Sequence, residues 1–157
     1  MTSTEKKSFI GVKMMKIESI KLLNFGALKT KNESLEENKN SPTGYFLYAD
    51  DVEFTETTAI LRAKKKLKFG IKYLVKGDNQ EGDNLVFFYC KIIHPEITNP
   101  DTNQRFSETT ERKSCYLNET NFDYLHFEHD WEVQKGTYIF QIFDENSMLV
   151  EKEFVLI

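Results

Sequence analysis

Apolar and polar residues alternate along most of the chain with a period of two. The clearest example is KLKFGIKYLVKG, residues 66–77, where every second residue is apolar and most of the residues between them are lysines. This alternation predicts a strand with one buried and one exposed face. The same pattern recurs in short segments separated by turn-forming residues, and no long helical period competes with it. We expect strands at residues 16–24, 45–49, 52–61, 66–77, 84–95, 105–117, 137–144 and 149–157.

One long polar stretch lies between the first two predicted strands. Residues 29–43, KTKNESLEENKNSPT, contain little that a core would bury, and we expect a mobile loop. Ser34 and Glu37 have the spacing of a helix capping box, so a single helical turn is the alternative.

The chain is long enough for one domain. It has 157 residues, of which 39% are hydrophobic and 13% aromatic, a composition that favours a globular, strand-rich fold. We expect residues 1–15 to form a disordered leader and residues 16–157 to form a single domain. Lys13 and Lys16 interrupt the apolar residues near the N-terminus, so a secretion signal is not predicted. A cytoplasmic location follows as the default, although export is not excluded.

The overall charge argues against an electrostatic partner. The formal net charge is -4, from 25 acidic and 21 basic residues, which gives no general attraction to nucleic acid. A basic cluster in residues 62–72 lacks interleaved exposed aromatics, and lysines on an outward face also protect a sheet edge. No run of ~20 apolar residues is present for a membrane span. We therefore expect no nucleic-acid partner and no membrane insertion.

Three segments of the chain resemble those of a known protein family. They are LKFGIKYLVKG, KIIHPEITNPDTNQRF and HDWEVQKGTYIFQIFDENSMLVEKEFVLI, in this order. From about Lys16 to Ile157 the chain resembles a small bacterial family of unknown function with an immunoglobulin-like fold. The resemblance implies an all-β, immunoglobulin-like antiparallel β-sandwich of about seven to nine strands. It implies no activity and no site residues.

Residues 92–106, IIHPEITNPDTNQRF, have the composition of a functional loop. His94, Asp101 and Arg105 would form a loop site if the segment folded them together. Turn chemistry explains the same residues, because Pro95 favours an extended His94 and residues 99–102 fit a type I turn. We expect a bend between two strands, with the loop site as the alternative.

Metal and catalytic chemistry find little support. Cys90 and His94 are four residues apart, about 13 Å along a strand, whereas donor atoms on one zinc ion lie within ~4 Å of each other. His126 and His129 would point to opposite faces of a strand. No nucleophile elbow, phosphate-binding glycine loop or zinc-protease motif is present. We expect no metal, no cofactor and no catalytic residues, and free thiols at Cys90 and Cys115 instead of the disulfide of antibody domains.

Two predicted strands are apolar on both faces. Phe87 and Tyr89 share an outward face with Lys91, and Ile139 and Phe143 flank Gln141 in a later strand. In an immunoglobulin-like order these strands are neighbours, so their outward side chains would merge into one patch. The alternative without a functional role is that the polar loop, residues 29–43, or residues 96–111 fold over the patch and cover it.

This patch makes a non-enzymatic binding or assembly module our main functional hypothesis. Its partner would be another protein or a second copy of the chain. The rivals are a pocket for a small molecule or carbohydrate and a cryptic enzyme around His94. A concave cleft with convergent polar groups would favour either rival.

Overall fold

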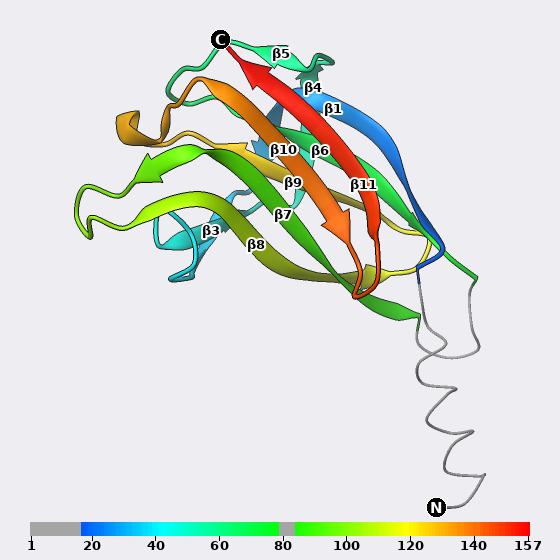
Figure 1. Ribbon diagram of the computed structural model, residues 1–157. Coiled ribbons are helices and arrows are strands. Elements are labelled where there is room, and N and C mark those ends of the chain that lie inside the picture. The colour runs from blue at the N-terminus through cyan, green and yellow to red at the C-terminus, as the bar shows by residue number, and fades with distance from the viewer. Residues whose placement is uncertain (1–16, 79–83) are drawn as a thin grey trace, which may run out of the picture.

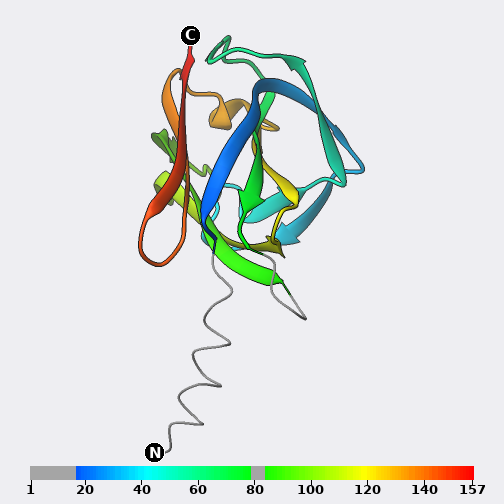
Figure 2. The same ribbon diagram turned by 90° about the vertical axis from the view of Figure 1, so that its right-hand side faces the viewer.

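Two sheets face each other across one core in the computed structural model, which describes residues 17–78 and 84–157 (Figures 1 and 2). The four-stranded sheet has the order β4 (Asp51–Glu56), β1 (Ser19–Lys31), β6 (Lys68–Lys76) and β9 (Thr120–His126). The five-stranded sheet has the order β5 (Ile60–Leu61), β11 (Met148–Leu156), β10 (Gly136–Phe143), β7 (Leu85–Thr98) and β8 (Arg105–Tyr116). A separate hairpin pairs β2 (Ser34–Glu37) with β3 (Tyr45–Tyr48), and a 3-10 helix, η1, covers Asp130–Glu132. The predicted leader lies outside the described residues.

The core consists of aromatic and branched side chains from both sheets. Phe69 in β6 lies at its centre and contacts four other rings edge to face, with centroids 5.4 to 5.9 Å away. The alternation of β6 is confirmed, because its predicted inward residues are fully buried. The largest fully buried side chains are Tyr73, Tyr138, Phe69, Phe88, Phe140 and Phe154.

The all-β sandwich predicted from the sequence is confirmed, but several element boundaries differ. The predicted strand 52–61 is two strands, β4 and β5. The helical turn proposed from Ser34 is wrong, because residues 34–37 pair with β3 as a strand. The strand β9 was not predicted. Asp123 is the one buried residue of β9, and its charge interrupts the alternation of apolar and polar residues that predicts a strand.

The interpretation of the lysines in β6 as protection of a sheet edge is also wrong. β6 lies between β1 and β9, so it is an inner strand. Lys68 and Lys72 project from the outward face of the four-stranded sheet and are half-buried, and Lys68 contacts Glu33 and Thr30. The exposed lysines of this cluster, residues 64–66, precede the strand.

The segment 92–106 bends between two strands as predicted. β7 continues through Pro95 to Thr98, with a register shift against β8 between Ile93 and Ile97. The Asn99 side chain accepts hydrogen bonds from the backbone of the next turn residues, as an Asx turn does. The closing backbone bond is donated by Asn103, one residue later than a type I turn over residues 99–102 would place it.

Gly70 permits the close approach of β9 to β6. A Cβ atom at this position would lie 2.0 Å from the carbonyl oxygen of Asp123 and 2.6 Å from Cα of Tyr124. Both are backbone atoms, so the clash cannot be relieved by rotating a side chain. The absence of a side chain at Gly70 therefore fixes the position of β9 and, with it, that of Asp123.

We predict that Gly70→Ala lowers the free energy of unfolding by about 1–3 kcal/mol, because it forces β9 away from β6. The melting temperature should fall by about 2–4 °C per kcal/mol. Ser114→Ala, at an exposed position of β8, is the control and should change stability by less than ~0.5 kcal/mol. An unchanged melting temperature for Gly70→Ala in thermal unfolding would contradict the close approach.

Candidate functional site

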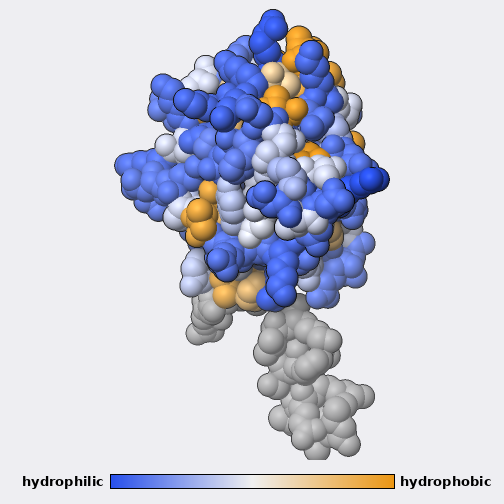
Figure 3. All heavy atoms as spheres, turned by 90° about the vertical axis from the view of Figure 1, so that its left-hand side faces the viewer, coloured by the Kyte–Doolittle hydropathy of each residue, from blue (hydrophilic) through white to orange (hydrophobic). Residues whose placement is uncertain are grey.

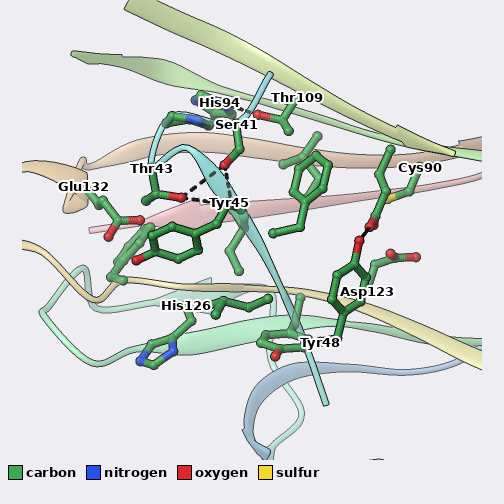
Figure 4. Close-up of a pocket in the computed structure, with 18 of the residues that line it drawn as sticks. Ser41, Thr43, Tyr45, Tyr48, Cys90, His94, Thr109, Asp123, His126 and Glu132 are labelled. Carbon is green, nitrogen blue, oxygen red and sulfur yellow. Dashed lines mark hydrogen bonds between the residues drawn. The ribbon is translucent and has the colours of Figure 1, made fainter. Parts of the chain in front are cut away.

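A cavity of about 220 Å³ lies at the open edge of the sandwich, between the edge strands β8 and β9 (Figure 4). Residues 41–48, which include β3 and are called the strap below, cross this edge and form the cavity's cover. The remaining walls come from β7, β8, β9 and η1. The sandwich edge is therefore hollow instead of being filled by core side chains.

The strap is fastened to both sheets by side-chain hydrogen bonds. Tyr48 donates its hydroxyl to Glu111 of β8 at 2.6 Å, and Tyr45 donates to Glu128, just after β9, at 2.7 Å. The Asn99 amide also donates to the carbonyl of Pro42 at 3.0 Å. The backbone ladder of β3 is made with β2, within the same hairpin. The strap is thus held over the cavity by side chains at three points.

A buried polar cluster forms one end of the cavity. Lys113 of β8 pairs with Asp123 of β9 at 2.8 Å, and Tyr73 of β6 donates its hydroxyl to the other oxygen of Asp123. Only 14% of the Lys113 side chain and 6% of the Asp123 side chain are exposed. Burial alone would lower the pKa of Lys113, but the Asp123 and Glu111 carboxylates outweigh it and raise that pKa. Lys113 is therefore charged and fixed in place.

The other end of the cavity is formed by His94, Thr109, Tyr45 and Glu132. His94 is buried, stacks on Tyr138 and donates its Nδ1 hydrogen to the Pro95 carbonyl at 2.8 Å. Burial lowers the pKa of His94, so its ring is neutral near pH 7. Figure 4 shows the carboxylate of Glu132 and the ring of Tyr45 on the same side of the cavity.

The predicted loop site does not form. His94 points into the cavity, whereas Asp101 and Arg105 are exposed. Arg105 lies opposite Thr98 at the far end of β7, and four residues of strand, about 13 Å, separate Thr98 from His94. The alternation of β7 directs His94 inward, while the turn carries Asp101 outward. The three residues therefore do not share one site.

The adjacency predicted for the apolar patch is confirmed. Tyr89 lies opposite Phe143 with the two rings stacked at 5.5 Å, and Ile139 lies opposite Ile93. Phe87 is 50% exposed. Figure 1 looks onto this outer face of the five-stranded sheet, and no described segment lies across it. The prediction that residues 29–43 or 96–111 cover this face is wrong. Residues 29–43 contribute to β1, β2 and the strap, and residues 96–111 belong to the β7–β8 hairpin.

The cysteines and the other histidines have separate surroundings. Cys90 is buried and Cys115 partly exposed, and both are free thiols, as predicted. His126 contacts Glu33 at 2.9 Å and points away from the cavity in Figure 4, while His129 stacks on Trp131. In residues 17–78 and 84–157, no three His, Cys, Asp or Glu side chains are placed to hold a metal ion. In the same ranges, no helix has the length and apolar character to cross a membrane.

The surface on the strap side is mostly hydrophilic. Figure 3 shows the left-hand side of Figure 1, where the β7–β8 turn, η1 and β3 lie, and its hydrophobic residues form small separate groups. This side therefore lacks the broad apolar surface of a protein-docking site, and its distinguishing feature is the cavity.

Sequence reasoning did not find the cavity, although β8 carries a signal of it. The predicted strand 105–117 is polar on both faces, which is unusual for a strand of a sandwich with one buried face. Thr109, Glu111 and Lys113 alternate along its inward face. Polar residues on the inward face of a strand indicate a polar or hollow interior beneath it.

Two of three comparisons with known proteins give a match, and the structural one shows the immunoglobulin-like fold. The model of a family described as "Domain of unknown function (DUF3859)" matches residues 16–156. A crystal structure of an immunoglobulin-like protein from Pseudomonas aeruginosa superposes with a TM-score of 0.62 and 22% identity, over 88% of this chain and 96% of that one. No curated protein matches the chain. The structural similarity establishes the fold and carries no function at this level of identity.

We predict that Lys113→Met lowers the free energy of unfolding by about 3–5 kcal/mol, because it leaves the Asp123 carboxylate buried without its cation. Lys91→Met is the matched control. Lys91 pairs with Glu108 on the outer face, where both side chains are partly exposed, and its loss should cost no more than ~1 kcal/mol.

Adding Asp123→Asn to Lys113→Met should recover much of the loss, since the amide still accepts the Tyr73 hydrogen bond without carrying a charge. Chemical denaturation measures all four proteins. Equal losses for Lys113→Met and Lys91→Met would contradict the assignment of a buried ion pair at the cavity.

Proposed function

We propose that this chain, which belongs to the family of the domain of unknown function DUF3859, is a non-enzymatic binding module that holds a small organic molecule beneath the strap. The observation that carries the proposal is the cavity between β8 and β9. A well-packed sandwich fills such space with side chains, because interiors pack as densely as organic crystals. Here the edge strands are spanned by a strap instead.

The lining combines apolar surface with a few polar groups, as small-molecule sites do. Ile92, Ile97 and Phe127 supply apolar surface, and the two polar ends described above lie on either side of the strap. The volume of about 220 Å³ is below the ~300–1,000 Å³ typical of sites for drug-sized ligands. The occupant we propose is therefore small.

The chemistry of the lining supports binding more than catalysis. Burial raises the pKa of the Cys90 thiol well above its usual range, which disfavours the reactive thiolate. The Ser41 hydroxyl donates to the carbonyl of Tyr45 at 2.7 Å. The Thr109 hydroxyl lies 3.5 Å from His94 Nε2, which is long for a hydrogen bond. The Cys90 thiol is therefore held in its protonated form, and the Ser41 hydroxyl donates to a carbonyl instead of to a base.

We predict that Thr109→Phe abolishes ligand binding, because Thr109 faces the cavity and the larger ring would fill it. Thr110→Phe is the matched control, since Thr110 is the next residue of β8 and is exposed on the outer face. A library of small organic fragments, screened by shifts in the amide NMR spectrum, provides the probes.

Wild type and Thr110→Phe should show shifts at the strap, β8 and β9 that are missing in Thr109→Phe. Fragments that bind all three proteins alike, or a library without any fragment that binds at millimolar concentration, would contradict the proposal.

A second candidate function is self-association through the outer face of the five-stranded sheet. Arg112 and Glu108 are exposed on β8, on either side of the row that contains Lys91 and Gln141. A two-fold axis across the strands at this row would place Arg112 of each copy against Glu108 of the other. The same axis would set the stacked aromatic pair of one copy against the isoleucine pair of the other. The residues on either side of this row are thus complementary between two copies, as a two-fold dimer requires, and the Lys91 of each copy lies on the axis with Glu108 as its partner.

We predict that the protein sediments as a dimer and that Phe87→Ser shifts it toward a folded monomer, because Phe87 contributes exposed aromatic surface. Leu35→Ser is the control, since Leu35 is 61% exposed in β2, in the β2–β3 hairpin and away from this face. Arg112→Glu should also weaken the dimer, and Arg112→Glu combined with Glu108→Arg should restore it. A monomeric wild type in analytical ultracentrifugation, or a charge exchange without rescue, would remove this candidate.

A further inference from the structure

The charges around the cavity are unbalanced. Among its described lining residues are four carboxylates and a single ammonium group, that of Lys113. Lys113 forms an ion pair with Asp123 and lies near Glu111, so its positive charge is neutralised by the carboxylates at its own end of the cavity. The lining carboxylates are Glu111, Asp123, Glu128 and Glu132.

The His94 end of the cavity has carboxylates without a cation. Glu128 and Glu132 line the cavity near Tyr45, and His94, which lines it as well, is neutral because burial lowers its pKa. The imidazole that acts on Glu132 is that of His129, whose charge lowers the pKa of Glu132 by less than burial raises it. Glu132 is buried, and one of its oxygens accepts the backbone hydrogens of Glu128 and His129 at 3.1 and 2.9 Å. Glu128 accepts the Tyr45 hydroxyl at 2.7 Å, so the hydrogen bonds to Glu128 and Glu132 come from neutral donors.

Aromatic rings lie beside these carboxylates. Tyr45 spans from the strap to Glu128, and Phe127 and Tyr138 pack against each other beneath His94, with centroids 5.9 Å apart. The negative face of an aromatic ring attracts an ammonium group, and a carboxylate supplies the hydrogen-bond acceptor. Apolar residues further along the cavity, such as Ile92 and Leu125, would contact an uncharged body.

We propose that the molecule held beneath the strap is a small organic amine, bound as its ammonium ion, with its charged group beside Glu132 and Glu128 and its apolar part along β7 and β9. This inference rests on the proposed function and adds the chemical class of the ligand. An anion would meet the unbalanced carboxylates at this end, and a neutral molecule would leave their charge uncompensated.

The amine should bind more tightly as the pH rises. Burial raises the pKa of Glu132, so this carboxyl keeps its proton to a higher pH than an exposed glutamate does. An ammonium ion favours the ionised carboxylate and must displace that proton. Of the neighbouring titratable groups, Glu128 and His129 act directly on Glu132, and His129 lies outside the cavity. The other acidic, basic and imidazole side chains of the described lining are Glu111, Asp123, Lys113, His94 and His126, and its tyrosines and Cys90 also carry titratable groups. Protonation of His94 in acid would add a positive charge beside the site and would weaken amine binding in the same direction.

A matched series of probes tests the ligand class: hexylamine, hexan-1-ol and hexanoate, which share one apolar chain and differ in the head group. Isothermal titration calorimetry with the full chain should show that hexylamine binds at least about tenfold more tightly than hexan-1-ol. One hydrogen bond to a charged group contributes enough free energy for a difference of this size. The preference should grow as the pH rises above the usual titration range of a glutamate, because the pKa of Glu132 is raised.

The variant Glu132→Gln should remove most of this preference while preserving the fold, because an amide oxygen still accepts the two backbone hydrogens that Glu132 binds. Glu128→Gln is a second variant with the same expectation should Glu132→Gln fold poorly. Glu108→Gln, on the outer face of β8, is the control and should leave hexylamine binding unchanged.

The outcomes separate this inference from the proposed function. Binding of hexan-1-ol or hexanoate as tight as that of hexylamine, blocked by Thr109→Phe, would overturn the amine and leave the cavity as the site. Hexylamine affinity that is unaffected by both Glu132→Gln and Glu128→Gln would also overturn it. Failure of every probe and every fragment to bind would overturn the proposed function itself.

Discussion

The buried ion pair between Lys113 and Asp123 is the interaction on which the cavity depends. It joins β8, the edge of the five-stranded sheet, to β9, the edge of the four-stranded sheet, and Tyr73 anchors it to β6 at the centre. Two edge strands of opposing sheets would otherwise close on each other or open to solvent. A charged pair that is desolvated and hydrogen-bonded holds one fixed geometry, because any other arrangement leaves a buried charge without a partner. The pair thus sets the spacing of the cavity walls.

The strap completes the site by a different kind of contact. Its tyrosines reach one sheet each, Tyr48 to Glu111 and Tyr45 to Glu128, so that a hairpin outside both sheets bridges them. The Tyr73 and Lys113 contacts are buried, whereas the strap contacts lie nearer the surface, where hydrogen bonds exchange more readily with water. The walls of the cavity are therefore joined by buried contacts, whereas its cover is held by contacts nearer the surface. A cavity with buried walls and a partly exposed cover favours ligand binding at the sandwich edge. The flat outer face is less favoured for docking, because its rings Tyr89 and Phe143 already stack on each other.

The sequence was sufficient for the parts of the fold that obey local rules. Alternation placed Phe69 and Tyr73 in the core, and it put Phe87 and Phe143 on outward faces that do lie side by side. It failed where tertiary contacts reverse a local preference. Asp123 is a charged residue at an inward position, which hid β9, and its burial is possible only because Lys113 approaches from the other sheet.

The cavity has the same origin. Tyr45 and Glu128 are 83 residues apart and Tyr48 and Glu111 are 63 apart, so no local pattern brings them together. His94 was identified as a candidate, but its assumed partners in the turn were wrong, because strand geometry sends it inward and them outward.

The most direct test of the central claim is where a bound molecule lies. Intermolecular nuclear Overhauser effects between a fragment that binds and the methyl groups of the protein report this position without any substitution. We predict cross-peaks from the fragment to the methyl groups of Ile92, Ile97 and Leu125, which line the cavity. Cross-peaks to Met148 and Ile139 on the outer face of the five-stranded sheet, with none to the cavity methyl groups, would contradict a binding site beneath the strap.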